Sequence, residues 1–554
     1  MDRAGGIRGT DLAARRWRSA WPVHLATLAA AFLLLLRLNQ GQWFLRDEWA
    51  FLVDRGGPDD PGIFEPHNEH WTTIPILVYR ALFAVFGVRT YVPYVVVLIV
   101  VHLVAAHLLW RVMRRAGADA WVATAAVPIL LVFGPGADNL VSAFQITFVG
   151  SVAFGLGHVL LADHTGGFGR RDVLGWGLAL GGLMCSGIGI PMTAAAGLTA
   201  LGRRGVVGFL QTAGPPTLVF ALWLVTAGGR ILESGGADEL TVALLGGYVW
   251  TGVRTTVEAV AGPPAAALLL TAATGGGIVL LLVRRRVPVP ALACAAGVVG
   301  LFLLTGFGRA EAGSAPVPSP RYAYVAAALL LPLFAVALSE IGRLAPALWL
   351  VPCLAAVVAA GAVLVELGRR AEAQAERDGF AREVILAASR PEHLEGPLLT
   401  DTPDPRDAPN LQLDELLALR DAGDLPPAPP PSDEALLQVA LGLQVAVETG
   451  DPRAESGAAT VHAKGMRLEP DGSCLVATPF RPRPRLEIVS EGVRIGMRAA
   501  SEVSAALVRD GVRTRVPRRF DARDVLITLG VPGAATVFRF QPSDEVLLCG
   551  AGPR

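Results

Sequence analysis

Residues 91–110 read Tyr-Val-Pro-Tyr-Val-Val-Val-Leu-Ile-Val-Val-His-Leu-Val-Ala-Ala-His-Leu-Leu-Trp, a run with no charged side chain. A helix of about 20 apolar residues is long enough to cross the hydrocarbon core of a bilayer. Similar apolar segments occur at 21–38, 120–134, 140–162, 206–227, 264–283, 287–305, 322–338 and 344–366. The sequence therefore predicts an α-helical polytopic membrane protein.

The composition agrees with this class. Of the 554 residues, 52% are hydrophobic and only 17% are charged, against about a quarter charged in soluble domains. These values exclude a soluble multidomain enzyme and a disordered chain. Five cysteines are too few for a disulfide-dense scaffold, and a formal net charge of zero gives no indication of a nucleic-acid partner.

Residues 173–201 form an apolar stretch that is too long for one crossing and too short for two. Its centre, residues 185–191, reads Cys-Ser-Gly-Ile-Gly-Ile-Pro. Glycine and proline allow two short helices to meet partway through a membrane when protein buries the freed backbone groups. We interpret the stretch as a broken hairpin, which brings the expected number of transmembrane helices to about 11.

Arginine clusters predict the orientation, because basic residues are enriched in cytoplasmic loops. All clusters fall on the cytoplasmic side if two conditions hold. Residues 173–201 must return to the side that they left, and 72–88 must form a surface helix, which its one-sided apolar pattern favours. This places residues 1–20 in the cytoplasm, the 39–90 loop outside, and the C-terminal domain outside the plasma membrane of the cell. The clusters comprise Arg15, Arg16, Arg18, Arg111, Arg114, Arg115, Arg170, Arg171, Arg203, Arg204, Arg284, Arg285, Arg286 and Arg343.

The chain changes character after the transmembrane domain, residues 21–366. Residues 367–432 are first helix-prone and then Pro-rich, with a helical island at 412–422, and predict a linker. Residues 433–554 contain runs of alternating polarity separated by turn signals, and predict a small extracytoplasmic β-rich domain. Cys474 and Cys549 are the two cysteines of this domain. They form either a disulfide, as an oxidising compartment favours, or two buried free thiols.

Acidic residues concentrate in the first external loop. Asp47 and Glu48 follow the first span closely, so we expect them at the membrane surface. A carboxylate at this position can act as general base toward an acceptor hydroxyl. The alternative is an ordinary solvated loop.

The same loop contains His67, Glu69 and His70. Two histidines at this spacing are weak candidates for a divalent metal, since zinc prefers three or four ligands at fixed spacing. The alternative is that Asn68 caps the surface helix. We assign no cofactor and keep a divalent metal as a second possibility.

Two later external segments carry further polar residues. Asp138 and Gln145 lie at the second external loop, where Gln145 can bind a polar headgroup or another helix. Arg321 and Tyr322 begin a later span. An arginine there can hold a phosphate through a forked contact. Alternatively, it extends toward lipid headgroups beside a tyrosine of the aromatic belt.

The predicted topology, together with Asp47-Glu48 and Arg321-Tyr322, resembles the GT-C superfamily of polytopic membrane glycosyltransferases. This superfamily includes protein O-mannosyltransferases, lipid A aminoarabinose transferases and mycobacterial arabinosyltransferases. The resemblance covers residues 20–366 and does not extend to the C-terminal domain. It implies a polyprenyl-phosphate-linked sugar as donor, with its phosphate near Arg321 and Tyr322. It also implies that Asp47 is the base of an inverting transfer and that Glu48 orients the acceptor or Asp47. The rim of the pocket would be shaped by His67, Glu69, His70, Asp138 and Gln145.

The 135–140 loop departs from the pattern of the superfamily, because Asp138 stands there without the second acid of an Asp-x-Asp motif. This departure puts a metal-dependent variant in doubt. Two other functions remain open. A lipid-linked-sugar transporter or flippase would use the break at 185–191. A non-catalytic membrane scaffold would use its external domain for binding.

Overall fold

The computed structural model describes residues 3–55, 62–228, 242–310, 318–344, 350–454, 459–489 and 492–553. The chain divides into two compact units, which are described separately. The first comprises Met1–Gln42, Pro61–Ala81 and Val92–Ala375, and the second comprises Trp43–Asp60, Leu82–Tyr91 and Glu376–Arg554. The predicted 39–90 loop is therefore not one element, because its segments belong to different units.

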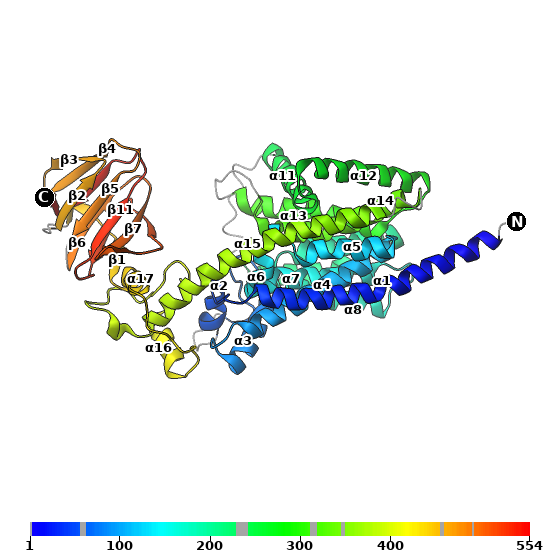
Figure 1. Cartoon of the computed structure of the whole chain (residues 1–554), viewed down its shortest axis with the longest axis horizontal. Coiled ribbons are helices and arrows are strands. Elements are labelled where there is room, and N and C mark those ends of the chain that lie inside the picture. The colour runs from blue at the N-terminus through cyan, green and yellow to red at the C-terminus, as the bar shows by residue number, and fades with distance from the viewer. Residues whose placement is uncertain are drawn as a thin grey trace. The chain divides into compact units, whose positions relative to one another are not determined.

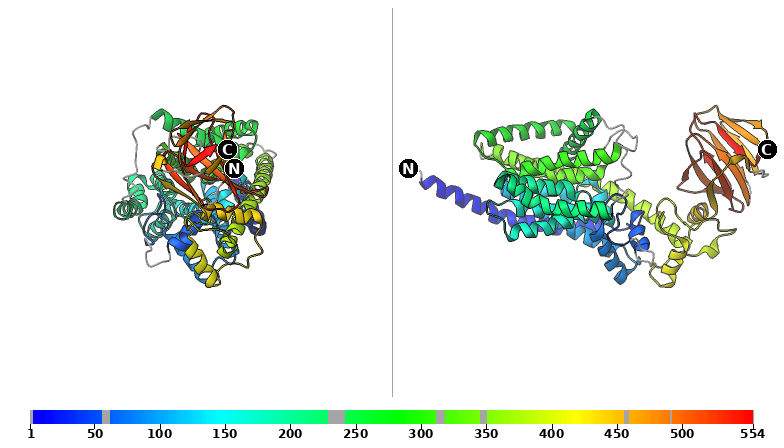
Figure 2. Two further views of the ribbon diagram at one scale, coloured as in Figure 1. Left: turned by 90° about the vertical axis from the view of Figure 1, so that its left-hand side faces the viewer. Right: turned by 180° about the vertical axis from the view of Figure 1, so that it is seen from behind.

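The first unit is a bundle of helices lying side by side (Figures 1 and 2). Its long helices are α1 (Arg3–Leu38), α4 (Val92–Ala116), α5 (Ala120–Leu131), α7 (Ile146–Ala162), α8 (Arg170–Leu183), α9 (Gly189–Thr226), α11 (Val242–Ala261), α12 (Pro264–Val283), α13 (Val289–Ala310), α14 (Pro320–Gly342) and α15 (Leu350–Ala388). Helix α11 was missed by the sequence analysis. Helix α3 (Thr73–Phe86) corresponds to the predicted surface helix.

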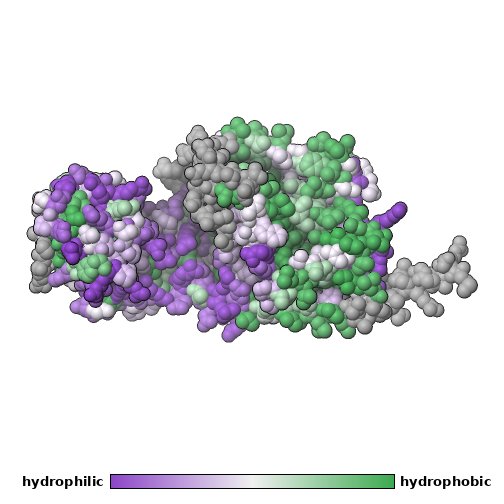
Figure 3. Space-filling model, turned by 90° about the horizontal axis from the view of Figure 1, so that it is seen from above, coloured by the Kyte–Doolittle hydropathy of each residue, from purple (hydrophilic) through white to green (hydrophobic). Residues whose placement is uncertain are grey.

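Within the described ranges, eight helices are long and apolar enough to cross a membrane. They lie in α1, α4, α7, α9, α12, α13, α14 and α15, while α3 and α5 are apolar but shorter. Large hydrophobic side chains such as Leu218, Leu268 and Val358 are more than 70% exposed, and one face of this apolar surface is visible in Figure 3. A membrane protein is the class that this surface indicates. The number of about 11 transmembrane helices stays a prediction.

Helix α9 folds back on itself at Gly205, which has φ +70° and ψ −165°. A Cβ placed on Gly197 would lie 3.0 Å from the Cβ of Ala213, although 16 residues of straight helix would span about 24 Å. The reversal requires a positive φ, which glycine adopts without steric cost. The segments before and after Gly205 are therefore two antiparallel arms.

The predicted break in 173–201 is present between α8 and α9, at residues 184–188. The carbonyl of Met184 accepts a 3.1 Å hydrogen bond from the backbone N–H of Ile74, next to the start of α3. The break thus lies beside the segment that carries His67 and His70, and its depth in a membrane stays a prediction.

At one end of the bundle, which we name the Arg-rich end, buried acids form ion pairs with arginines of several predicted clusters. Asp163 pairs with Arg115 at 3.1 Å and with Arg203 at 2.6 Å, and Asp172 pairs with Arg204 at 2.7 Å. Both carboxylates are at most 4% exposed. Each buried carboxylate therefore needs the positive charge of its arginine partners to compensate its own charge.

Glu340 is the third buried acid of the Arg-rich end. It pairs with Arg284 at 2.7 Å, with Arg286 at 3.7 Å and with Arg343. Arg343 also donates to the carbonyl of Gly117, two residues after Arg115. The clusters that contain Arg115, Arg284 and Arg343 are therefore neighbours in space. The side of the membrane that they face stays a prediction.

The predicted linker is a folded part of the second unit. Helix α15 runs without interruption from the apolar segment to Ala388, and α16 (Leu413–Asp421) matches the predicted helical island. The Pro-rich segment packs onto α17 (Asp433–Leu443), where the N–H of Leu399 donates a 2.7 Å hydrogen bond to the carbonyl of Leu443. Buried Leu411 and Leu416 anchor this segment, so its prolines do not make it a free spacer.

The C-terminal domain consists of two β-sheets, as the alternating polarity predicted. The first has the order β1-β10-β6-β12-β4-β3, and the second has the order β13-β2-β5-β11-β7-β8, with β9 also paired to β7. The strands are β1 (Val445–Thr449), β2 (Ala459–Lys464), β3 (Met466–Asp471), β4 (Cys474–Pro479), β5 (Arg485–Val489), β6 (Val493–Arg498), β7 (Glu502–Arg509), β8 (Val512–Arg513), β9 (Arg518–Asp521), β10 (Val525–Leu529), β11 (Ala535–Arg539), β12 (Val546–Cys549) and β13 (Ala551–Pro553).

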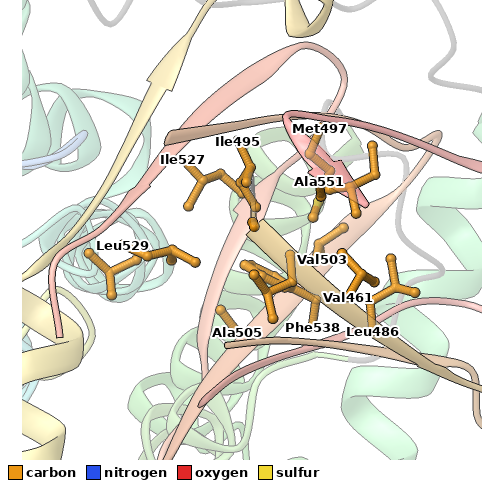
Figure 4. Close-up of a cluster of buried hydrophobic side chains, with 14 of the residues drawn as sticks. Val461, Leu486, Ile495, Met497, Val503, Ala505, Ile527, Leu529, Phe538 and Ala551 are labelled. Atoms are coloured by element: carbon orange, nitrogen blue, oxygen red, sulfur yellow. The ribbon is translucent and has the colours of Figure 1, made fainter. Parts of the chain in front are cut away.

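Alternate residues of both sheets form the core of this domain. Leu486 from one sheet and Ile495 and Ile527 from the other point into a single buried cluster (Figure 4). In the first sheet Cys474 and Cys549 are directly opposite on β4 and β12, and their sulfurs are bonded. Of the two alternatives for these cysteines, the structure therefore contains the disulfide.

Candidate functional site

The segment 62–72 is held against the bundle by tryptophans. The rings of Trp71 and Trp223 stack with centroids 5.0 Å apart, and Trp223 Nε1 donates a 2.7 Å hydrogen bond to the carbonyl of Phe64. Trp71 Nε1 donates to Thr73 Oγ1 at the start of α3. These contacts fix both ends of the short turn that carries His67 and His70.

His67 and His70 close a tight turn. The N–H of His67 donates to the carbonyl of His70 at 3.0 Å, and the N–H of His70 donates back at 3.1 Å. Asn68 in this turn has φ +52°, a conformation that asparagine tolerates better than most residues. Asn68 therefore does not cap α3, which begins five residues later, and Glu69 is exposed in the turn.

His70 lies against the break between α8 and α9. A Cβ on Gly187 would lie 3.2 Å from Nδ1 of His70, so a larger residue at this position would crowd the imidazole. Burial lowers the pKa of His70 to about 4, and the positive charges of Arg321 and His67 act in the same direction. The ring is therefore neutral near pH 7, and can donate through one nitrogen and accept through the other.

The turn Ala143–Gln145 and the start of α7 place two aromatic rings between the histidine turn and Arg321. The ring of Phe144 meets the ring of His67 edge-on at 6.0 Å, and Phe148 lies under the guanidinium of Arg321. Phe144 lies in the 3-10 turn Ala143–Gln145 and Phe148 in the first turn of α7, so two consecutive turns of the chain supply both aromatic contacts. Gln145, three residues before Phe148, is 7% exposed, and its Oε1 has no hydrogen-bond partner in the described structure.

Arg321 occupies the first turn of α14, behind Pro320. Its guanidinium carbon is 5.5 Å from the ring centre of Phe148 and 5.6 Å from that of Tyr322. Its backbone carbonyl accepts a 3.0 Å hydrogen bond from Nδ2 of Asn139. The Nε of Arg321 is buried and has no hydrogen-bond partner in the described part of the chain. An unsatisfied buried donor of this kind is costly unless a ligand completes it.

These residues define the His70–Arg321 cluster, which comprises His67, His70, Phe144, Phe148, Arg321 and Tyr322. Sequence analysis named both histidines, Arg321 and Tyr322, and singled out the 185–191 break that contains Gly187, but it missed the two phenylalanines. The spacing of Phe144 and Phe148 around Gln145 was the available signal. The predicted rim residue Asp138 is exposed at the start of the short helix α6 (Asp138–Val141), and no described contact links it to the cluster.

The donor set of the cluster does not fit a metal. No three His, Cys, Asp or Glu side chains of the described ranges gather closely enough to hold one. The positive charge of Arg321 also acts on His70 and opposes a second cation. The cluster instead offers one guanidinium and two imidazoles, which are groups that bind an anion.

Asp47 and Glu48 belong to the second unit and form the short helix α2 (Asp47–Trp49). Asp47 is half-buried, whereas Glu48 is 1% exposed. Tyr91 Oη donates a 2.8 Å hydrogen bond to Oε1 of Glu48, and the N–H of Leu45 donates a 2.9 Å hydrogen bond to Oε2. Both carboxylate oxygens of Glu48 are therefore engaged in holding the loop.

The residue before this acidic pair contacts a second acidic pair that sequence analysis missed. The N–H of Arg46 donates a 2.6 Å hydrogen bond to the carbonyl of Asp407. Asp404 and Asp407 are both 6% exposed, and burial together with the charge of Asp407 raises the pKa of Asp404 to about 6. Both acids lie in the Pro-rich segment. Sequence analysis interpreted that segment as a linker and therefore did not consider them.

No protein-family model matches this sequence, and no curated protein is significantly similar to it. The class of protein therefore follows from the structure itself, as a mostly helical membrane protein with a C-terminal β-rich domain.

Proposed function

We propose that this chain is a membrane glycosyltransferase of the GT-C type. It would transfer a sugar from a polyprenyl-phosphate donor to an extracytoplasmic acceptor, which is a cell-envelope glycan, lipid or protein. The arginine clusters support a cytoplasmic N-terminus. The disulfide between Cys474 and Cys549 supports a C-terminal domain in an oxidising compartment outside the cell membrane.

The observation that carries the proposal is the environment of the Arg321 guanidinium. Its buried Nε lacks a hydrogen-bond partner within the described residues, while two rings hold the guanidinium in place. A guanidinium with a free donor is suited to a forked contact with a phosphate. In this proposal Arg321 binds the donor phosphate and neutral His70 donates a further hydrogen bond. Phe148 and Tyr322 fix the orientation of the guanidinium.

Asp47 is the base in this proposal. Its side chain is half-buried at the start of α2, whereas both oxygens of neighbouring Glu48 accept hydrogen bonds. Asp47 takes the proton of the acceptor hydroxyl as that oxygen bonds to C1 of the sugar. The bond from C1 to the phosphate oxygen breaks, and polyprenyl phosphate leaves with its charge compensated by Arg321. Glu48 acts as a positioning residue for this loop.

Phosphate recognition can be tested on purified full-length protein in detergent. Thermal unfolding is followed with polyprenyl phosphate and with the uncharged polyprenol of the same length. A ligand at 100 times its dissociation constant adds about 2.7 kcal/mol to the stability of the folded state. We expect this gain with polyprenyl phosphate for the wild type, and its loss in Arg321→Ala.

Arg254→Ala is the matched control, because Arg254 is exposed and its ion pair among the described residues is with Glu258 on the same helix at 2.8 Å. This variant should retain the full gain. Equal stabilisation by polyprenol, or an unchanged gain in Arg321→Ala, contradicts the proposed phosphate site. Transfer of radiolabelled sugar from a panel of polyprenyl-phosphate donors then tests the reaction itself.

A further inference from the structure

A row of cations crosses three neighbouring strands of the second β-sheet. Lys464 on β2 is directly opposite Arg485 on β5, and Arg485 is directly opposite Arg539 on β11. These strands are adjacent in the sheet, as Figure 1 shows. Like charges at directly opposed positions destabilise a sheet. The arrangement therefore costs stability unless an anion compensates it.

The loop between β4 and β5 adds two more cations. Residues 480–485 read Phe-Arg-Pro-Arg-Pro-Arg, and the two prolines restrict the backbone. The N–H of Phe480 donates a 3.0 Å hydrogen bond to the carbonyl of Gly465, which ties the loop to the end of β2. Arg481 and Arg483 are exposed, and the guanidinium of Arg481 lies 5.7 Å from the ring centre of Phe480.

These side chains line one concave surface, which we name the basic hollow. Its volume is about 620 Å³. The lining residues that the argument uses are Lys464, Arg481, Arg483, Arg485, Arg539 and Phe540. Phe480 beside it is 63% exposed, so an aromatic ring is available next to the cations.

The basic hollow also stands out in its charge pairing. Several arginines elsewhere in the domain pair with acids, as Arg453 does with Asp471 at 2.5 Å and Arg498 with Asp524 at 2.5 Å. Within the described residues, no ion pair involves any of the five cations that line the hollow.

Two neighbouring groups set the local charge. Glu487, the nearest acid along β5, is opposite His462 and Val537 and not opposite a cation. Arg513 is a further cation near the hollow: burial, together with the positive charges of Arg539 and Arg485, lowers its pKa. Residues 445–553 contain 15 basic and 13 acidic residues. The positive charge is therefore a local concentration and not a property of the whole domain.

We infer that the basic hollow binds an acidic glycan, meaning a saccharide whose units carry carboxylate or phosphate groups. Forked guanidinium groups pair with such anions, and the exposed ring of Phe480 can pack against the face of a sugar ring. A concave surface with a rigid rim fits a protruding chain better than a flat lipid surface. The disulfide-bonded domain is also suited to the extracytoplasmic side, where envelope glycans are found. This inference is independent of the proposed transferase activity.

The test uses the full-length protein in phosphatidylcholine nanodiscs and requires no turnover. Fluorescent polygalacturonate and a phosphorylated mannan are the acidic probes, and dextran is the neutral one. We expect at least one acidic glycan to bind, with affinity that falls as salt rises, and dextran not to bind. The variant Arg481→Gln/Arg483→Gln/Arg539→Gln should weaken binding about tenfold, since three partly exposed ion pairs are removed.

The matched control removes three exposed arginines from other parts of the same domain, as Arg467→Gln/Arg519→Gln/Arg523→Gln. It should retain wild-type affinity. Equal losses in both variants would indicate general charge attraction and overturn the inference. The same applies if the first variant binds normally, if neither acidic glycan binds, or if the wild type instead co-floats only with vesicles of phosphatidylcholine and phosphatidylglycerol.

Discussion

The hydroxyl of Tyr91 donates a 2.8 Å hydrogen bond to Oε1 of Glu48, and so joins two segments of the second unit that are 43 residues apart. The N–H of Leu45 occupies the other carboxylate oxygen. Glu48 is therefore fixed by its own loop, while its neighbour Asp47 is half-buried. Two adjacent acids thus have different environments, which suggests separate tests.

Replacing Glu48 should affect stability first. Glu48→Gln and Tyr91→Phe each weaken a buried hydrogen bond to a charged group, so we expect each to lower the free energy of unfolding by about 1–3 kcal/mol. The double variant should lose less than the sum of the two, because both changes remove one interaction. Thermal or denaturant unfolding of the purified protein measures this coupling.

Asp47→Asn should abolish sugar transfer, since the amide cannot accept the proton of an acceptor hydroxyl. The free energy of unfolding of the same variant is measured beside the transfer. Normal transfer by Asp47→Asn would exclude Asp47 as the base. If transfer falls only because less of the protein is folded, Asp47 has a structural role and is not the base.

Because the pKa of His70 is lowered in the folded protein, we expect the stability of the protein to depend on pH. Its pKa in the folded protein is about 4, below the ordinary value of 6.5, so folding favours the neutral ring. The stability that depends on this neutral form is complete above pH 6.5 and is lost as the pH falls from 6.5 toward 4. The loss amounts to at most about 3 kcal/mol. We expect the melting temperature of the wild type to fall over this interval, and that of His70→Gln to fall less.

His462→Gln is the control for this measurement, because His462 is exposed on β2. Its melting temperature should follow the wild-type curve. The Arg321→Ala variant should raise the pKa of His70, since a nearby positive charge is removed. A slope that is identical in the wild type and in His70→Gln would show that other groups cause it.

Glu340 should be critical for the stability of the first unit. It is 1% exposed and faces Arg284, Arg286 and Arg343. The three arginines that remain are partly exposed and solvated, so we expect Glu340→Gln to cost about 1–3 kcal/mol, the range for losing a buried hydrogen bond to a charged group. The control Glu258→Gln removes an exposed pair and should cost less than about 1 kcal/mol. Unfolding in detergent compares the two, and similar small costs would contradict the importance of the Arg-rich end.

The disulfide predicts the thiol count and the stability of the C-terminal domain. Denatured, unreduced protein should react with maleimide at three cysteines, Cys185, Cys294 and Cys353, and at five after reduction. The bond closes a loop with a sequence separation of 75 residues, so Cys474→Ser/Cys549→Ser should lower stability by about 2–4 kcal/mol. Cys353→Ala should leave it nearly unchanged. Five reactive thiols before reduction would show that the bond does not form.

The sequence predicted parts of the site because polar residues are conspicuous in an apolar chain. Arg321, His67 and His70 were identified in this way. Phe144 and Phe148 were missed, because aromatic residues near a membrane have many structural roles. Asp404 and Asp407 were missed because proline content was taken to indicate an extended linker, whereas this segment packs on α17.

Local sequence alone determined the apolar helices, the alternating strands and the turns, because bilayer thickness and side-chain periodicity act within short segments. Only the tertiary structure decided that His70 lies beside Gly187 and near Arg321, that α9 reverses at Gly205, and that Cys474 is opposite Cys549. These relationships join residues far apart in the chain. They depend on how whole helices and strands pack, which no short segment encodes.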